Sequence, residues 1–393
     1  MLPLSRIVPP VLLVAMVVSL RPGDRDPKSG PILQGVGPHE ATVLLHLPGG
    51  GRPRMEVGDP MGGAFQELGA RKGLGGRWEF RIRGLMPDSR YRYRLFSQQG
   101  KSLGGGVFRT APLPGRGKVR FAAFGDSGKI PGWTYFRDST GVQPAPWLQR
   151  IWPDQGAQGL LARHILERSP DLVLHLGDLV YPWGRWEHYG LAVFEPFREL
   201  LARADFRPSL GNHDLITARG GPLFRAFLYP RADQRYYSFV RGPVLFLCLD
   251  AFSSPIGEKS PQFAWIQRTL AQSREPWKVV FLHRPFFTAS RSRKDRENDQ
   301  LRRLVHPLFA KYRVSLVLSG HDHVYERYKP QDGVHYAVVG GGGKNLYQLH
   351  PDPLLEKSCR CFSYVLVEAG ERSFFFQAFS IGRERLDAFQ LAR

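Results

Sequence analysis

The sequence predicts an α/β protein that begins with a β-sandwich, and three observations lead to this prediction. Short strand-like segments with frequent turns precede residue 115, apolar strands and helical stretches then alternate, and the last part of the chain is rich in strands again. Short strands with turn signals are typical of a sandwich, whereas strand–helix alternation indicates α/β layering. A length of 393 residues suits two or three domains.

The N-terminal region supplies the sandwich, which we place at residues 23–115. A turn at Met86-Pro87-Asp88-Ser89 separates two of its strands, and the Pro-rich stretch 111–115 ends the region. The expected strands are 41–47, 77–82, 91–97 and 107–110.

Residues 116–393 supply the layered unit, and the strand-rich tail is expected to complete a second sheet. Its predicted helices are 156–168, 191–202, 262–272 and 299–312. Its predicted strands are 119–124, 171–176, 206–210, 244–250, 278–283, 314–318, 336–339, 364–368 and 374–379.

The N-terminus has the pattern of an export signal. Arg6 precedes residues 7–20, which are apolar apart from Pro9-Pro10 and Ser19. This run is short for a membrane span, which needs roughly 20 residues. A clean cleavage site is missing, so residues 1–22 are read as a signal peptide or an uncleaved anchor, and the protein as extracytoplasmic. The alternative is a cytoplasmic chain with an apolar N-terminus.

The chain is strongly basic, with a formal net charge of +20. Such a charge attracts anions, including phosphate esters, nucleic acids and anionic lipids. The cations are spread along the sequence, so a basic solvated surface is the simpler explanation. No recognisable nucleic-acid motif is present, and we expect no specific nucleic-acid partner.

The three cysteines do not decide the redox compartment. Cys248 lies in the apolar run 244–249 and is expected to be a small core residue. Cys359 and Cys361 are expected to be too close for an easy mutual bridge, so one of them could pair elsewhere.

Five apolar strands each end in a cluster of Gly, Asp, Asn or His. In open α/β sheets ligands bind beyond the carboxyl ends of strands, so these clusters should form one site. Carboxylate, imidazole, amide and phenol donors together suit Fe, Zn or Mn, and their number suits two ions about 3.5–4 Å apart. The clusters contain Asp126, Asp178 with Tyr181, Asn212-His213-Asp214, His283, and His321-Asp322-His323.

The order and spacing of these clusters resemble the calcineurin-like metallophosphoesterases, and within them the purple acid phosphatases. The resemblance covers residues 118–345 in motifs and about 30–390 in architecture. It implies a four-layer α/β/β/α catalytic unit. The stretch 84–87 before Tyr91-Arg92-Tyr93-Arg94 also resembles a fibronectin type III strand and the N-terminal module of purple acid phosphatases.

One substitution within the motifs points to the subgroup. Typical calcineurin-like enzymes have a metal-binding histidine where this chain has Gly128. Tyr181 looks like its replacement, as in purple acid phosphatases, and a phenolate is a hard donor that suits Fe(III). The alternative is that Tyr181 is an aromatic residue that packs near the site without binding metal.

The resemblance then assigns ligands and a reaction. Fe(III) would be held by Asp126, Asp178, Tyr181 and His323, and a second ion, Fe(II), Zn(II) or Mn(II), by Asp178, Asn212, His283 and His321. Asp178 would bridge them, and metal-bound hydroxide would attack the phosphorus of a small phosphate monoester in line. A phosphodiesterase or nucleotide hydrolase on the same site is the alternative.

Other residues receive roles less directly. The resemblance makes His213 a phosphate ligand or proton donor, with Asp214 as its acidic partner, and Asp322 structural. Trp183, Trp186 and Tyr189 could wall the pocket or pack in the core, and the glycines at 340–343 could approach the site closely. In place of the substrate-binding histidines of plant members, this chain has a loop with Arg291, Arg293, Lys294 and Arg296 that could clamp phosphate or be solvated.

Overall fold

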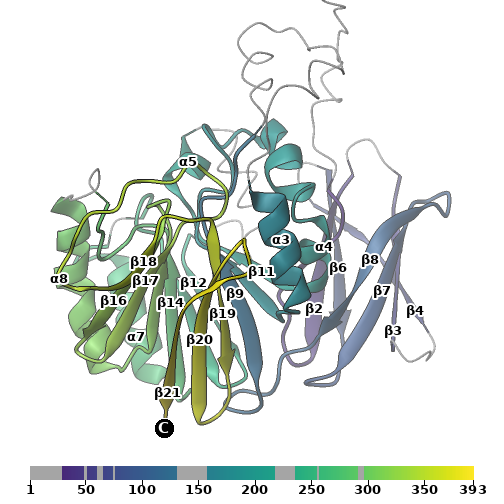
Figure 1. Cartoon of the computed structure of the whole chain (residues 1–393). Helices are drawn as coiled ribbons and strands as arrows, with labels where there is room; N and C mark the ends of the chain where they lie inside the picture. The colour runs from purple at the N-terminus through teal and green to yellow at the C-terminus, as the bar shows by residue number, and fades with distance from the viewer. Residues whose placement is uncertain are drawn as a thin grey trace, which may run out of the picture.

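The computed structural model describes residues 29–47, 51–59, 65–73, 76–130, 157–216, 235–254, 256–290 and 296–393. Strands β1–β8 form two four-stranded sheets, and β9–β21 form a six-stranded and a seven-stranded sheet. Figure 1 shows the first group beside the layered remainder of the chain. The mixed α/β fold with a β-rich N-terminal region is therefore confirmed.

The two N-terminal sheets enclose a core of their own. In β6, Trp78, Phe80 and Ile82 are buried, whereas the alternating charged residues point away from the core. This period-two pattern is what a half-buried strand requires. One sheet has the order β1 (Ile32–Gln34), β2 (Glu40–His46), β6 (Arg77–Arg83), β5 (Arg71–Lys72), and the other β4 (Gln66–Gly69), β3 (Arg54–Gly58), β7 (Arg90–Phe96), β8 (Ser102–Arg109).

The six-stranded sheet begins with three parallel strands. Leu172–His175 of β10 pair with both β9 and β11, and every residue of this strand is buried. Continuous apolar runs of this kind are typical of parallel strands that are covered on both faces. The order is β11 (Asp205–Pro208), β10 (Leu172–His175), β9 (Val119–Phe124), β19 (Ser363–Ala369), β20 (Ser373–Ser380), β21 (Arg385–Ala392).

The seven-stranded sheet faces the six-stranded one. Phe121 of β9 meets Phe246 of β13 edge to face, with ring centroids 5.1 Å apart, so both sheets contribute to one core. The order is β12 (Tyr237–Arg241), β13 (Val244–Cys248), β14 (Trp277–Leu282), β15 (Leu316–Ser319), β17 (Val334–Val339), β16 (Tyr325–Gln331), β18 (Leu355–Cys359), with β13, β14, β15 and β17 parallel.

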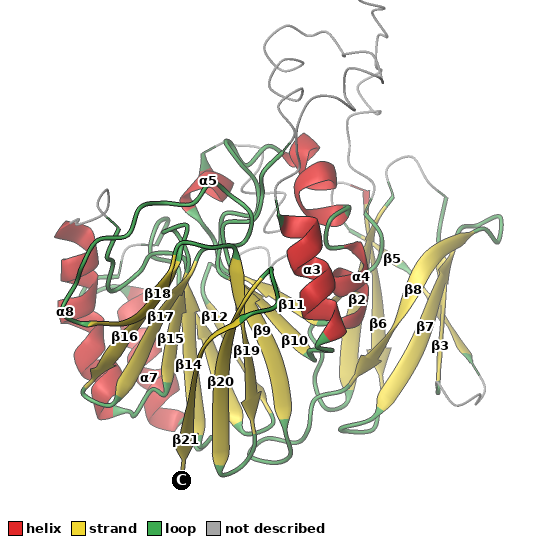
Figure 2. Ribbon diagram, viewed as in Figure 1, coloured by secondary structure: helices red, strands yellow, loops and turns green. Residues whose placement is uncertain are grey.

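Helices cover the outer faces of the two sheets. Leu161 of α3 (Gln158–Glu167) and Leu201 of α4 (Arg198–Arg203) belong to the core beside the six-stranded sheet. α7 (Pro261–Gln272) and α8 (Arg296–Lys311) pack on the seven-stranded sheet. Figure 2 shows these two pairs of helices on opposite sides, which gives the α/β/β/α layering.

The predicted helix at 191–202 is divided in the structure. A π-helical turn, Gly190–Phe194, is followed by the shorter α4. Pro196 lies between them, and a proline lacks the backbone donor and clashes with the preceding helical turn. Several edge strands, including β12, β18 and β21, have mixed polarity and were not predicted.

The two folded units touch along α4 and β11. The Tyr93 hydroxyl donates to the Ala202 carbonyl at 2.7 Å, and Gln34 Nε2 donates to the Phe206 carbonyl at 3.2 Å. Arg241 is buried and donates to the Arg109 carbonyl at 2.8 Å. These contacts attach the N-terminal strands to the layered unit.

The expectation for the paired cysteines is wrong. Cys359 and Cys361 form a disulfide, because the chain turns after β18 and brings their Cα atoms 5.3 Å apart. Disulfides span Cα separations of about 4.4–6.8 Å, so the short sequence separation does not prevent the bond. Cys248 is a free, buried core residue, as predicted.

No helix among the described residues has both the length and the apolar character needed to cross a membrane. The predicted signal or anchor at residues 1–22 and the basic residues 291–295 lie outside the described residues.

Candidate metal centre

The structure brings the predicted polar clusters together at one edge of the layered sheets. Asp126 and Asp178 follow β9 and β10 of the six-stranded sheet, and Asn212 begins the short helix α5 (Asn212–Leu215) after β11. His283 follows β14, and His321 and His323 follow β15 of the facing sheet. The site therefore lies where the carboxyl ends of two sheets meet, near α5 in Figure 1.

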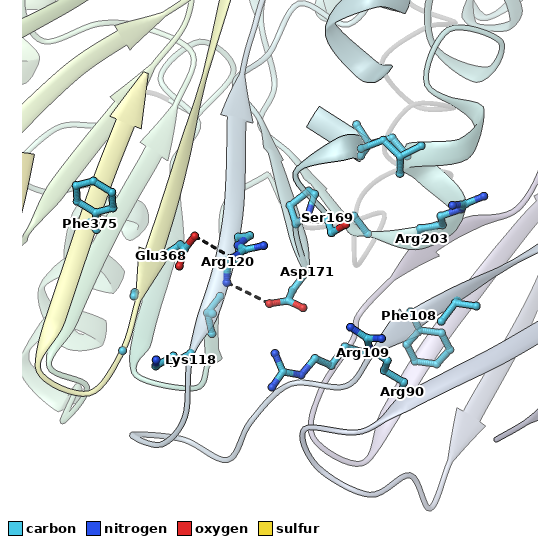
Figure 3. Close-up of a pocket in the computed structure, with 18 of the residues that line it drawn as sticks. Arg90, Phe108, Arg109, Lys118, Arg120, Ser169, Asp171, Arg203, Glu368 and Phe375 are labelled. Carbon is cyan, nitrogen blue, oxygen red and sulfur yellow. Dashed lines mark hydrogen bonds and ion pairs between the residues drawn. The ribbon is translucent and has the colours of Figure 1, made fainter. Parts of the chain in front are cut away.

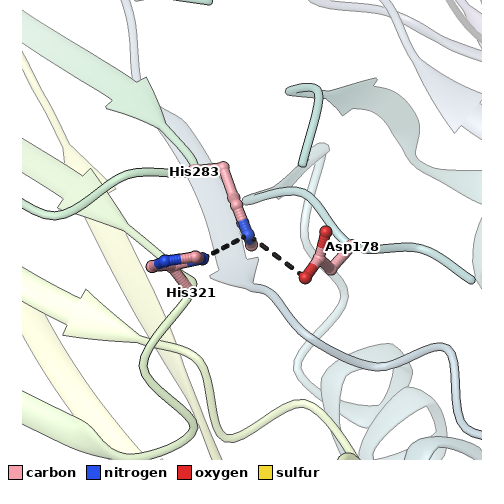
Figure 4. A group of neighbouring side chains, drawn as sticks. All are labelled: Asp178, His283 and His321. Carbon is pink, nitrogen blue, oxygen red and sulfur yellow. Dashed lines mark hydrogen bonds and ion pairs between the residues drawn. The ribbon is translucent and has the colours of Figure 1, made fainter. Parts of the chain in front are cut away.

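Asp178, His283 and His321 form the tightest cluster of potential ligands. One donor atom from each lies within 4.8 Å of the others. Asp178 Oδ2 is 3.2 Å from His283 Nε2, which is 3.1 Å from His321 Nδ1. Figure 4 shows the three side chains converging from separate strand ends. All three are buried, as a closed metal site requires.

The Tyr181 hydroxyl is the centre of a second group. Its oxygen lies 2.9 Å from Asp126 Oδ1, 2.9 Å from Asp178 Oδ2 and 3.0 Å from His323 Nε2. A phenol carries one proton, so it can donate to only one of these acceptors at a time. Burial, together with Asp126 and Asp178, raises the pKa of Tyr181 well above its usual value. A cation among these oxygens and nitrogens would reverse that shift.

Asn212 contributes an acceptor without a partner. Its Oδ1 is buried and has no hydrogen bond among the described residues. Leaving a buried polar atom unsatisfied costs about 1–3 kcal/mol, so such an atom calls for an explanation. Ligation of a cation explains it, and the donor set as a whole fits two metal ions.

Backbone carbonyls hold two of the histidines in a ligating orientation. His283 Nδ1 lies 2.6 Å from the Leu176 carbonyl, and His323 Nδ1 lies 2.7 Å from the Asn345 carbonyl. A carbonyl accepts, so Nδ1 carries the proton in each ring and Nε2 points into the cluster. Metal-binding histidines are usually oriented in this way.

Protonation balances the negative charge in the metal-free site. Burial alone would lower the pKa of His283, but Asp178 and Asp126 outweigh it and raise that pKa to about 9. Burial likewise opposes the charge on Asp178, yet neighbouring His283 holds the pKa of this carboxyl well below its usual value. A protonated imidazole therefore stands where a metal ion could provide the positive charge.

Three of the predicted ligands have left-handed backbone conformations. The φ angles are 61° at Asp126, 55° at Asp178 and 73° at His321. Such angles are uncommon outside glycine and concentrate at functional sites. Hydrogen bonds maintain them: the amide of His321 donates to Asp126 Oδ2 at 2.8 Å, and the amide of Asp178 donates to Asp214 Oδ2 at 2.9 Å.

His213 and Asp214 have different surroundings. His213 Nδ1 lies 2.5 Å from the Pro182 carbonyl, and its ring centroid is 4.4 Å from that of Tyr181. Asp214 is fully buried, and its oxygens accept from the amides of Asp178, Leu179 and Gly211, each at 2.9 Å. Burial first, and Asp178 second, raise the pKa of Asp214 to about 8.

Gly128 explains why the first motif lacks a histidine. A Cβ added there would lie 1.9 Å from the Leu179 carbonyl oxygen, far inside contact distance. The Gly128 carbonyl also accepts from the Tyr181 amide at 2.9 Å. The segment that carries Tyr181 therefore occupies the space that a side chain at 128 would need.

The other residues that the sequence suggested fall into core residues and residues near the site. Trp186 and Tyr189 are core residues, whereas Trp183 is 43% exposed. Asp322 is buried, and its Oδ2 accepts from the Thr288 hydroxyl, a contact that fits a structural role. Gly340 approaches the site as expected: a Cβ there would lie 2.8 Å from Asp126 Oδ2.

Sequence reasoning missed one residue beside the site. Lys344 Nζ lies 4.5 Å from the centroid of the Tyr181 ring. In the sequence, the feature that could have indicated Lys344 is its position directly after the glycine run at 340–343.

Comparisons with known proteins identify phosphoesterases as similar to this chain. The family model described as Calcineurin-like phosphoesterase matches residues 119–325. Purple acid phosphatase 23 of Arabidopsis thaliana is 26% identical over 311 residues, covering 67% of this chain and 61% of the relative. The Fe(3+)-Zn(2+) purple acid phosphatase 12 of the same plant is 27% identical over 192 residues, covering 43% of this chain and 39% of the relative.

The structural comparison concerns the fold. The purple acid phosphatase PPD1 from yellow lupin seeds superposes with a TM-score of 0.76 at 20% identity, covering 94% of this chain and 75% of that one. Among the curated relatives, the chain spans 61%, 53% and 56% of the lengths of three Arabidopsis purple acid phosphatases.

Proposed function

The chain belongs to the calcineurin-like phosphoesterase family, as a purple acid phosphatase-like member, and from this premise we propose that it hydrolyses phosphate monoesters at a dinuclear metal centre. One observation carries the proposal. Asp178 Oδ2 lies 2.9 Å from the Tyr181 hydroxyl and 3.2 Å from His283 Nε2, so one carboxylate contacts both groups of potential ligands. A bridging carboxylate occupies this position in a two-metal site.

The donors divide into two sets that share Asp178. Asp126, Tyr181 and His323 complete one set, and its phenolate oxygen supports Fe(III) there. Asn212, His283 and His321 complete the other, whose amide and imidazole donors suit Fe(II), Zn(II) or Mn(II). Two bound cations would lower the pKa of a coordinated water and neutralise negative charge on the phosphoryl oxygens.

The protein's own groups then position the substrate and handle protons. His213 Nδ1 donates to the Pro182 carbonyl, which leaves Nε2 available to a phosphate oxygen or to the leaving group. Asp214 acts through the backbone, because its oxygens already accept from three amides. We therefore assign His213 a catalytic role and Asp214 a positioning role.

The expected partner is a small phosphate ester. An export signal at residues 1–22 would place the enzyme outside the cytoplasm, and its charge of +20 would attract anionic substrates. The corresponding test is N-terminal sequencing of the protein recovered from the extracytoplasmic fraction.

Metal analysis combined with a visible spectrum and two substrate assays tests the function. We expect two transition-metal ions per chain, a phenolate-to-Fe(III) charge-transfer band, and faster turnover of a phosphomonoester than of a bis-ester. Faster diester turnover would favour the phosphodiesterase alternative. Purified protein with fewer than one metal per chain and no hydrolysis after iron and zinc reconstitution would overturn the proposal.

A further inference from the structure

The glycine run at 340–343 fixes the position of Lys344 beside the predicted metal ligands. The Gly342 amide donates to the Gly125 carbonyl, and the Lys344 amide to the Asp126 carbonyl, both at 2.9 Å. A Cβ at Gly342 would lie 2.1 Å from the Gly125 oxygen, so only glycine permits this approach. The backbone of Lys344 is thus attached directly to the strand end that presents Asp126.

The side chain of Lys344 is directed at Tyr181. Its ammonium lies 4.5 Å from the ring centroid, within the range of a cation–π contact. The residue is half-buried, and among the described residues no carboxylate lies within ion-pair distance of Nζ.

This placement has a cost that the fold does not explain. A partly desolvated ammonium without a carboxylate partner is unfavourable, and the cation–π contact returns only about 0.5–2 kcal/mol. Contact with an anion that enters the site would supply the missing partner. Lysine is a common point-charge ligand of phosphate.

We propose that Lys344 binds the phosphoryl group of the substrate, supplying a cation beside the metal ligands. The inference rests on the proposed function and adds a specificity-determining residue to it. Lys129, which follows the first motif, is a second cation in the electrostatic surroundings of Lys344. Lys344 thus offers a phosphate contact among the described residues, whereas the basic residues 291–295 lie outside them.

Lys344→Met and Lys344→Arg in the metal-loaded enzyme test this role. Lys311→Met is the matched control, because Lys311 Nζ also lies over a tyrosine, 5.3 Å from the Tyr312 ring centroid on α8. Calorimetric binding of inorganic phosphate gives a readout that does not depend on turnover, and kcat and KM for a monoester complete the set.

Loss of a charge-assisted contact should weaken phosphate binding in Lys344→Met by about 10- to 100-fold. We expect KM to rise more than kcat falls, Lys344→Arg to recover most of the affinity, and Lys311→Met to match the wild type. If Lys344→Met loses metal, Lys344→Gln provides the same comparison with a polar side chain.

Two outcomes would overturn the inference, and they are distinguishable. Phosphate affinity within twofold of wild type in Lys344→Met, together with a shifted visible band, would mean that Lys344 only tunes Tyr181. A metal-loaded wild type that neither binds phosphate nor hydrolyses esters would refute the proposed function as well.

A separate observation concerns a cavity at the opposite edge of the six-stranded sheet. Its volume is about 720 Å³, and it lies where β7 and β8 meet α4 and the starts of β9 and β10. Figure 3 shows charged side chains from both folded units around it. The lining includes two carboxylates, Asp171 and Glu368, and five cations: Arg90, Arg109, Lys118, Arg120 and Arg203.

The cations of this cavity are incompletely neutralised. Arg90 and Arg109 are directly opposite residues of β7 and β8, an arrangement that is destabilising for like charges. Arg109 pairs with Asp88 at 2.6 Å, and Arg120 pairs with Glu368 at 2.9 Å. In the described parts of the chain, Arg90 and Lys118 have no carboxylate within ion-pair distance.

The geometry points to a binding site for a multivalent anion in this cavity, separate from the metal centre. A trisulfated disaccharide is a suitable probe because a phosphatase does not cleave it, and variants of the cavity separate binding here from binding at the metal centre. The variants are Arg90→Glu and Lys118→Glu. Arg268→Glu, an exposed position on α7, makes the same charge change elsewhere.

Titration calorimetry should show one site per chain. Each cavity variant should weaken it by about tenfold or more, whereas Arg268→Glu should stay within twofold. Equal losses in all three variants would indicate attraction to the net charge only, and absence of binding to the wild type would equally overturn the site.

Discussion

The two ends of strand β10 carry aspartates in very different settings. Asp171 precedes the strand, is only partly buried, and accepts from the Arg120 amide at 3.1 Å. Asp178 follows the strand, is buried, and has a φ of 55°. The amino end carries charge in a solvated crevice, whereas the carboxyl end carries charge that backbone geometry fixes in the interior.

This contrast shows that one strand can carry a solvent-screened charge at one end and a buried charge at the other. Beside Asp171, the exposed ion pair of Arg120 with Glu368 contributes little, because water screens it and both side chains stay mobile. A buried carboxylate needs a cation or several donors, and here it faces His283 and the Tyr181 hydroxyl. The functional consequence of a substitution should therefore depend strongly on which end of the strand it alters.

The largest effect is expected for Asp178→Ala. Loss of the shared carboxylate should remove both predicted metal sets, and activity should fall by about three orders of magnitude or more. Metal content by mass spectrometry and kcat/KM for a monoester are the measurements. Asp171→Ala, at the other end of the strand, should keep both the bound metal and the activity.

Asp171→Ala has its own expected cost. Its carboxylate supports the Arg120 amide, so we expect a loss of about 1 kcal/mol in the free energy of unfolding without loss of metal. If Asp178→Ala retained two ions and full activity, the distinction between the two ends would be wrong.

The second effect concerns Gly128. Gly128→His adds the residue of typical calcineurin-like enzymes, yet its Cβ would lie 1.9 Å from the Leu179 carbonyl. We expect a loss of several kcal/mol in stability, as overpacking and backbone displacement produce, and not a new ligand. Thermal unfolding measures the loss of stability, and metal analysis shows whether a ligand has been added.

Gly159→Ala is the matched control, because α3 leaves open space at that position. Alanine is favoured over glycine in a helix by about 1 kcal/mol, so this variant should be unchanged or more stable. Gly128→His with wild-type stability and an additional metal ligand would show that the tyrosine segment can move aside.

Much of the framework could be predicted from the sequence. Strand 119–124 was predicted with its observed bounds, and α7 to within one residue, because apolar runs bounded by turns leave few alternatives. Edge strands such as β21 lack this pattern, since half of their residues face solvent. The Cys359–Cys361 bond depends on a local turn that residue spacing does not reveal.

The candidate site followed from the sequence for a related reason. The potential ligands lie within a few residues of strand ends, and parallel strands end at a common edge. Lys344 was missed because its position depends on the packing of the glycine run against Gly125 and Asp126. Residues that reach a site through loop packing have no periodic signal in the sequence.

The third effect tests the phenol at the carboxyl end. Tyr181→Phe removes the hydroxyl that lies within 3.0 Å of Asp126, Asp178 and His323. With iron bound, the visible charge-transfer band should disappear. Tyr189→Phe, another buried tyrosine, should keep the band, and an unchanged spectrum in Tyr181→Phe would exclude this residue as a ligand.

The smallest effect is expected in the pH dependence of stability. It compares two further carboxylates, Glu326, buried near the site, and Glu368, exposed at the other edge. Burial raises the pKa of Glu326 to about 8 from 4.5, with Asp322 adding to the shift and the Tyr328 hydroxyl opposing it. The folded protein therefore binds this proton more tightly than the unfolded chain, and stability falls as pH rises from about 4.5 to about 8. Glu326→Gln stays neutral, so its advantage over the wild type should grow across this range and reach up to a few kcal/mol.

Thermal unfolding of the metal-free protein at several pH values measures this difference. Glu368→Gln is the control, because Glu368 is 48% exposed and pairs with Arg120 in the crevice. Its stability relative to wild type should change little above pH 5, since an exposed ion pair contributes little to stability. If Glu326→Gln and Glu368→Gln gave parallel pH profiles, burial of Glu326 would not govern its protonation. The difference between buried carboxylates at the carboxyl ends of the strands and exposed carboxylates at their amino ends would then hold only for carboxylates that face a cation.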